Sequence, residues 1–95
     1  MRRAAKVDAV QADITRALQV SGWCVLSLAA LGRGTPDLLC FHRGSSRMAL
    51  VEVKTGGART RWATARRQAA FAAVWPVTVL TSVEEALAWA RRQGA

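Results

Sequence analysis

Apolar residues recur along residues 3–20 at the spacing of an amphipathic helix. Ile14 and Leu18 belong to the apolar stripe, because side chains three or four residues apart lie on one helix face. Gln11 falls within the same stripe, and a polar side chain on a packing face needs a partner or a chemical task. Gly22 is suited to end the helix. The pattern therefore predicts a first helix with one polar side chain on its packing face.

Three apolar segments follow and alternate with turn residues, as in a series of strands. The first covers residues 23–30 and is apolar on much of both faces. The second covers residues 37–42 and the third covers residues 47–55. Glycine and proline in residues 32–36, and the G-S-S turn between the second and third segments, separate them. We expect the second and third segments to pair as a hairpin.

The second half of the chain returns to helical spacing. A helix is predicted over residues 64–74 with Thr64 as its N-cap. A short strand follows over residues 77–81. Ser82 and Glu85 then form a capping-box pattern for a last helix. The order is helix, three strands, helix, strand, helix, in a single domain.

Two carboxylates and a lysine are expected at one end of the hairpin. Asp37 opens one strand, and Glu52 and Lys54 share a face near the end of the next, because strand side chains alternate. Mg²⁺ prefers oxygen ligands, so we predict a site made by Asp37, Glu52 and the backbone carbonyl of Val53. Lys54 is placed to hold or polarise an attacking water, or to stabilise the pentavalent phosphorane.

The charge balance adds a partner to this picture. The 14 Lys and Arg residues outnumber the 6 Asp and Glu residues, which gives a net charge of +8. Such a domain attracts polyanions, and nucleic acid is the first candidate. The same bias is also typical of an arginine-rich protein from a high-GC genome. The side chains expected to contact the DNA backbone are Arg33, Arg59, Arg61, Arg66 and Arg67.

The chain resembles the PD-(D/E)xK nuclease superfamily, and within it the small stand-alone VRR-Nuc domains of phages and bacteria. The matching features are residues 34–37 (G-T-P-D), residues 51–54 (V-E-V-K), the helix from Gln11, Gly22-Trp23, Gln68 and residues 82–87. The resemblance implies an α/β fold with a restriction-endonuclease-like αβββαβα core, in which helices flank a mixed central sheet. Archaeal-type junction resolvases share a similar motif layout.

The resemblance also implies an activity. It indicates a Mg²⁺-dependent DNA endonuclease, with Mn²⁺ as a substitute, that cuts branched or structured DNA as a homodimer, like Holliday-junction resolvases or flap nucleases. Asp37, Glu52 and Lys54 match the catalytic residues of the family. Gln11 stands where the family usually has a Glu, so it joins the candidate catalytic residues. Gln68 and Asp8 are expected to support the site from behind its ligands.

The alternative is a catalytically weak or inactive DNA-binding module on the same fold. Gln11 motivates it, because an amide in place of a carboxylate leaves the metal site one charge poorer. Asp8 or Asp13 can compensate for that missing charge.

Cysteine use and hydropathy indicate where the protein acts. Cys24 and Cys40 lie in apolar segments without a C-x-x-C motif, which predicts two buried, reduced thiols. No signal peptide opens the sequence, and no apolar run approaches the ~20 residues that span a bilayer. We therefore expect a cytoplasmic protein with no membrane partner.

The aromatic side chains have two interpretations each. Trp62 lies between arginines, and it either stacks on a base or packs beneath its loop. Trp75 and Trp89 are predicted in the core or in a dimer interface. His42 follows a strand and is expected to be a surface or turn residue.

Overall fold

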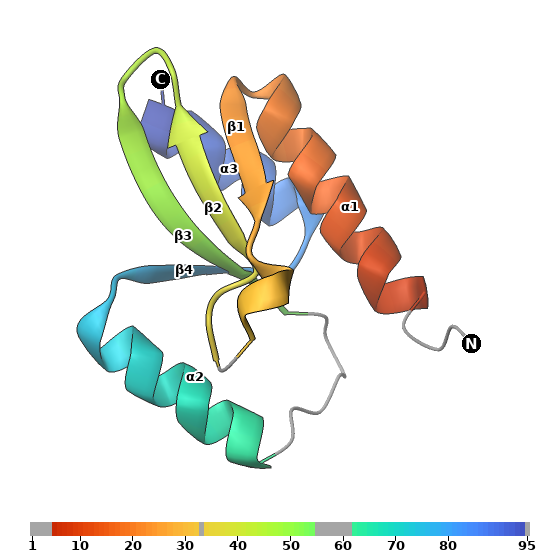
Figure 1. Cartoon of the computed structure of the whole chain (residues 1–95). Coiled ribbons are helices and arrows are strands. Elements are labelled where there is room, and N and C mark those ends of the chain that lie inside the picture. Colours follow the sequence, from red (N-terminus) through yellow and green to blue (C-terminus); the bar gives the residue numbers. More distant parts are fainter. Residues whose placement is uncertain (1–4, 33, 55–61, 95) are drawn as a thin grey trace.

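The described part of the chain is a small α/β protein with a mixed four-stranded sheet and three helices (Figure 1). The computed structural model describes residues 5–32, 34–54 and 62–94, with residues 5–8 described by their backbone alone. The element order matches the prediction. The elements are α1 (Ala5–Val20), β1 (Trp23–Ser27), β2 (Leu38–His42), β3 (Arg47–Val53), α2 (Trp62–Val74), β4 (Val77–Leu80) and α3 (Val83–Gly94), with a short 3-10 helix at Ala29–Leu31.

The sheet is antiparallel over its first three strands and parallel at its last pair. Its strand order is β1-β2-β3-β4, and β3 pairs with β4 in parallel. A parallel neighbour requires a crossover, and α2 lies within that connection. The pairing with β4 begins at Leu50, so β4 does not pair with Arg47, Met48 or Ala49.

The core lies between one sheet face and the helices α1 and α3. These helices come from opposite ends of the described chain and pack against each other. Trp23, the first residue of β1, points into this core. Its ring centroid lies 5.1 Å from that of His42 and 4.9 Å from that of Trp89. The buried apolar residues of this core are Ile14, Ala17, Leu18, Trp23, Leu38, Cys40, Val51, Val53, Leu80, Ala86, Trp89 and Ala90.

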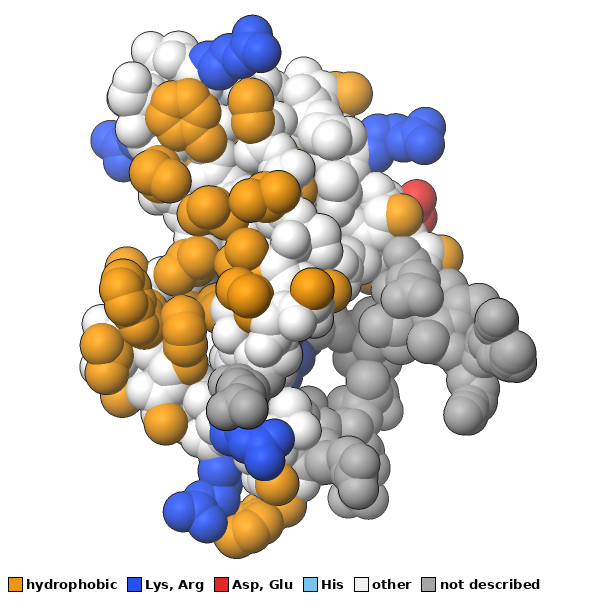
Figure 2. All heavy atoms as spheres, in the orientation of Figure 1, with side chains coloured by type: hydrophobic (Ala, Val, Ile, Leu, Met, Phe, Trp, Pro, Cys, Tyr) orange, Lys and Arg blue, Asp and Glu red, His pale blue; other side chains and the backbone are white. Residues whose placement is uncertain are grey.

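The opposite sheet face remains largely uncovered. We call this set of side chains the outer face; it consists of Cys24, Leu26, Leu39, Phe41, Met48 and Leu50. Leu26 is 58% exposed and Met48 is 64% exposed. The described side chains of α2 include none that is buried. Figure 2 shows hydrophobic side chains gathered over this face, with lysine and arginine side chains toward its margins.

Three expectations about local structure are corrected. The first strand ends at Ser27 instead of residue 30, because Ser27 Oγ accepts a hydrogen bond from the Ala29 N–H (3.3 Å) and the chain turns there. The second helix already begins at Trp62, so Thr64 is not its N-cap. Cys24 is exposed, because its side chain points to the outer face.

Other local expectations are confirmed. Cys40 is buried, and burial raises the pKa of its thiol to about 11. Ser82 caps α3, since its Oγ accepts a hydrogen bond from the Glu85 N–H (3.1 Å). His42 supports the β2–β3 turn, where its Nδ1 accepts a hydrogen bond from the Ser45 N–H (3.1 Å).

Candidate functional site

Asp37 and Glu52 meet at one end of the sheet, as the hairpin prediction required. The register that pairs Leu38 with Val51 continues outward and places Asp37 opposite Glu52. Asp37 Oδ2 accepts a hydrogen bond from the Val53 N–H at 2.7 Å. Because the N–H and C=O of one strand residue point to the same side, the Val53 carbonyl also faces the Asp37 side of β3. The Asp37 and Glu52 carboxylates therefore lie beside each other, with the Val53 carbonyl directed to the same side of β3.

Glu52 occupies an electrostatically costly position. It is only 8% exposed, and it is the buried charged residue of the described chain. Burial and the negative charge of Asp37 together raise the pKa of its carboxyl group to about 7, although Lys54 opposes this rise. A cation beside the two carboxylates would relieve both effects. Such an environment is typical of functional sites, although structural clusters also produce it.

Gln68 connects the two charged groups of β3. Its amide oxygen accepts a hydrogen bond from Lys54 Nζ at 2.8 Å, and its amide nitrogen donates one to Glu52 Oε2 at 3.1 Å. Lys54 Nζ itself lies 3.9 Å from Glu52 Oε2. The amide can satisfy a cation and an anion at once only in this orientation. Gln68 therefore links α2 to the strand that carries the candidate catalytic residues.

The loop before Asp37 packs tightly against α2. Gly34 has a φ of +79°, and a Cβ placed on it would lie 2.6 Å from the carbonyl carbon of Arg67. Only glycine allows this approach and this backbone conformation without strain. A cavity of about 300 Å³ lies between α2 and the sheet, with Glu52, Lys54 and Gln68 in its lining and apolar side chains around them.

The donor atoms fit a hard divalent cation. Across residues 5–32, 34–54 and 62–94, no group of three or more His, Cys, Asp or Glu side chains is assembled. Asp37, Glu52 and the Val53 carbonyl instead offer oxygen atoms alone. Mg²⁺ suits such a set because it usually keeps several waters, whereas structural zinc sites use four Cys or His ligands.

The remaining predicted residues are more dispersed. Gln11 is half-buried on α1, and it makes no hydrogen bond to Asp37, Glu52 or Lys54. Asp13 is exposed on the same helix, and Arg66 and Arg67 are exposed on α2. The expectations for the Asp8 side chain, Arg33, Arg59 and Arg61 lie outside the described residues.

Two features of the site were not predicted. Gly34 and the backbone of Arg67 form a close contact, and no sequence pattern relates a loop glycine to a residue so far along the chain. Arg66 also stacks on Trp62, with its guanidinium carbon 4.8 Å from the ring centroid. Their four-residue spacing was a detectable signal, because it places both on one helix face.

Comparison of the chain with protein-family models, with curated proteins and with solved structures finds no match. Among the described helices, none is long and apolar enough to cross a membrane.

Proposed function

We propose that this protein is a metal-dependent DNA endonuclease of the PD-(D/E)xK type, with a restriction-endonuclease-like core and a VRR-Nuc-like site. One observation carries the proposal: Asp37, Glu52 and Lys54 converge at one end of the sheet, and Gln68 holds the last two together. Its substrates are branched or structured DNA, such as four-way junctions or flaps. The reaction is hydrolysis of a phosphodiester bond by in-line attack of water.

Each side chain has a defined task in this proposal. Asp37, Glu52 and the Val53 carbonyl would hold Mg²⁺, or Mn²⁺ in its place. When bound, the cation lowers the pKa of a water and stabilises charge on a phosphoryl oxygen. Lys54 orients the attacking water or stabilises negative charge that develops on the phosphate. Gln68 fixes the Lys54 ammonium, so that its position does not depend on the substrate.

The charge of the molecule supports DNA as the substrate. A net charge of +8 favours association with a polyanion. Arg66 and Arg67 are exposed on the helix that also carries Gln68. Contacts of arginine with phosphates position the duplex without reading its sequence. Affinity for DNA should consequently fall steeply as salt concentration rises.

Cleavage of labelled four-way junction, flap and linear duplex DNA in Mg²⁺ or Mn²⁺ tests the proposal. We expect Lys54→Ala to abolish cleavage. Arg47→Ala is the matched control, because it also removes one positive charge but lies at the far end of β3. Intact substrates with the native protein, or equal loss of activity in both variants, would contradict the proposed activity.

Calorimetric titration with Mg²⁺ or Mn²⁺ tests the metal site independently of activity. We expect a binding isotherm in the native protein, and its loss in Asp37→Asn, which keeps the size of the side chain but removes its charge. A native-like isotherm in Asp37→Asn would place the cation elsewhere.

A DNA-binding module without catalysis is the second candidate. Two observations favour it: an amide stands at position 11, and the described residues assemble no three-carboxylate cluster. It predicts salt-sensitive DNA binding without any metal isotherm. Gln11→Glu separates the candidates further, because added charge at the site should raise metal affinity. An unchanged affinity would show that position 11 does not contribute to the site.

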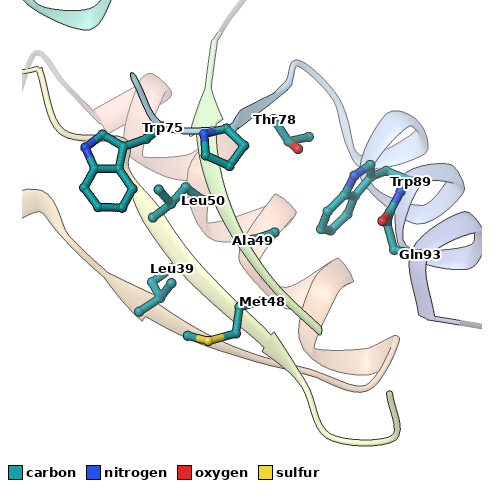
Figure 3. Close-up of a pocket in the computed structure, with 9 residues that line it drawn as sticks. Leu39, Met48, Ala49, Leu50, Trp75, Thr78, Trp89 and Gln93 are labelled. Carbon is teal, nitrogen blue, oxygen red and sulfur yellow. The ribbon is translucent and has the colours of Figure 1, made fainter. Parts of the chain in front are cut away.

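We also propose that the protein acts as a homodimer. A symmetric junction requires two cuts, and one domain of this size supplies one site. The six members of the outer face are uncharged. Glu52 and Lys54 lie on the same side of the sheet, but at its end beside α2, so two copies can meet over Leu26, Phe41 and Met48 without placing a charged side chain in that contact. Leu39, Leu50, Met48 and Trp75 help to line a hollow of about 330 Å³ beside β3. Figure 3 shows how these side chains lie. Isolated soluble chains rarely leave so many large apolar side chains in contact with water.

A further inference from the structure

Trp62 is the most conspicuous aromatic side chain outside the candidate site. It is 73% exposed at the start of α2, and it takes no part in the core. The other three tryptophans differ: Trp23 and Trp89 are buried, and Trp75 lines the hollow beside β3. An exposed indole ring contributes little to folding, because it gains almost none of the burial that stabilises core aromatics. Its position needs another explanation.

The surroundings of Trp62 suit an anionic, aromatic ligand. The Arg66 guanidinium lies over one face of the ring, 4.8 Å from its centroid, and holds it in place. A hollow of about 350 Å³ lies beside the pair and is lined by Trp62, Ala63, Arg66, Arg67 and Ala70. Among the described residues, this lining contains two arginines and no carboxylate. The patch thus offers an aromatic ring beside positive charge, which is the combination that single-stranded nucleic-acid sites use.

The patch has a fixed relation to the candidate active site. Gln68 follows Trp62 by six residues on the same helix, which corresponds to about 9 Å along its axis. Gln68 faces the sheet and bonds to Lys54 and Glu52, whereas Trp62 and Arg66 lie on a different side of α2. At a rise of about 3.4 Å per nucleotide, 9 Å corresponds to roughly two to three nucleotides. One DNA strand is therefore long enough to contact both.

We propose that Trp62 and Arg66 form a stacking platform for an unpaired base, so that the protein selects DNA with a single-stranded segment next to the cleavage point. The inference rests on the proposed nuclease function. Bases in the interior of a duplex already stack on both neighbours, so away from the duplex ends an indole ring can receive only a base that has left the helix. Arg67 and Arg66 hold the adjoining phosphates. With the platform, a surface that otherwise binds only the DNA backbone also distinguishes DNA with unpaired bases from fully paired duplex.

Fluorescence anisotropy in EDTA, with labelled duplex, overhang and single-stranded DNA, tests the platform without cleavage. We expect Trp62→Ala to weaken binding to overhang and single-stranded DNA by about 5- to 150-fold, since stacking on one base is worth about 1–3 kcal/mol. Binding to blunt duplex should change less than about threefold. Trp62→Phe keeps an aromatic ring and should restore most of the affinity.

Val74→Ala is the matched control, because Val74 is also an exposed apolar side chain (76%) on the same helix but lines neither the patch nor the hollow beside β3. It should bind all three DNAs like the native protein. Equal weakening on duplex and overhang DNA in Trp62→Ala, or no weakening at all, would overturn the platform. A thermal melt of each variant by circular dichroism separates lost binding from lost folding.

The outcomes also separate the platform from the proposed activity. If the protein cleaves no DNA but Trp62→Ala selectively lowers affinity for overhang DNA, the platform stands and the nuclease proposal fails. If cleavage depends on Lys54 but Trp62→Ala changes neither binding nor the preferred substrate, the nuclease proposal stands and the platform fails.

Discussion

The carboxyl group of Glu52 shows how a single residue couples the fold to the proposed chemistry. It is buried beside a second carboxylate and bonded to the amide of Gln68. In the metal-free protein this arrangement opposes folding whenever Glu52 is ionised, because both burial and Asp37 favour the protonated form. Ionised Glu52 is therefore destabilising in the metal-free protein, at the position where a cation is expected to bind.

The stability of the metal-free protein should therefore depend on pH through the ionisation of Glu52. The pKa of Glu52 rises from 4.5 in the unfolded chain to about 7 in the folded one. Protonated Glu52 contributes fully to the stability of the folded state below pH 4.5, and this contribution is lost as the pH rises through 7. The free energy of unfolding of Glu52→Gln, measured relative to that of the native protein, should rise by of order 2–3 kcal/mol from pH 4.5 to pH 8. Urea denaturation in EDTA at both pH values measures this, and a constant difference would contradict the assignment.

The helix α2 is held to the sheet in an unusual way for an element of a small domain. Its apolar contribution is small, since none of its described side chains is buried. Two other contacts secure it: the amide of Gln68 between Lys54 and Glu52, and the approach of Gly34 to the Arg67 backbone. The position of the proposed catalytic lysine thus depends on polar and backbone contacts of α2.

The contact between Gly34 and α2 can be tested by substitution. Gly34→Ala introduces a Cβ that meets the Arg67 backbone at 2.6 Å, in addition to the strain of a positive φ. Gly32→Ala is the control for backbone strain, because Gly32 has a φ of +59° and a ψ of −154°, which other residues rarely adopt, but its Cβ meets nothing within 4 Å. In urea denaturation, Gly34→Ala should lower the free energy of unfolding by about 1–3 kcal/mol more than Gly32→Ala does. Equal losses would mean that the loop does not pack on α2.

Hydrogen exchange should distinguish α2 from the other helices. Elements with few buried apolar contacts open locally at lower free energy than core elements. We expect amides of α2 to exchange faster than those around Ile14 and Leu18, which are fully buried on α1. Mass spectrometry of peptides from both helices measures the difference. Equal protection would indicate that α2 unfolds only together with the core.

The sequence predicts the elements and the hairpin end better than it predicts how α2 is attached. Alternation along β3 and its pairing with β2 are local rules, so Asp37, Glu52 and Lys54 could be brought together from the sequence alone. Gly34 meets Arg67 through tertiary packing, which no periodicity encodes. The sequence predicts Cys24 in the core because alternation does not reveal that no described helix covers this sheet face over β1.

At the scale of the whole molecule, the two faces of the sheet differ in how far they are covered. The face toward α1 and α3 carries the core, while the outer face presents Leu26, Phe41 and Met48 to solvent. Burying a large apolar side chain is worth about 1.5–3 kcal/mol. A second copy that covered these side chains would therefore add substantially to the marginal stability of a small domain.

Sedimentation velocity tests the proposed dimer. Met48→Lys places a charge in the middle of the outer face and should yield a monomer. Val20→Lys is the matched control, because Val20 is 77% exposed on α1, away from that face. A monomer in the native protein at micromolar concentration, or a dimer in Met48→Lys, would contradict this interface. Loss of junction cleavage in parallel would link the two sites of the dimer to the reaction.

The packing of α1 against α3 also has a consequence for synthesis. Ala86, Trp89 and Ala90 complete a core whose other wall is Ile14 and Leu18. The first helix can contact β1 early, but it lacks its α3 neighbour until residues 83–94 have been translated, so part of its apolar stripe stays uncovered in the meantime. Contacts between residues so far apart in sequence form slowly, and exposed apolar surface favours aggregation during that interval. Chaperone demand on the nascent chain should thus be set by the last helix and not by the proposed catalytic hairpin.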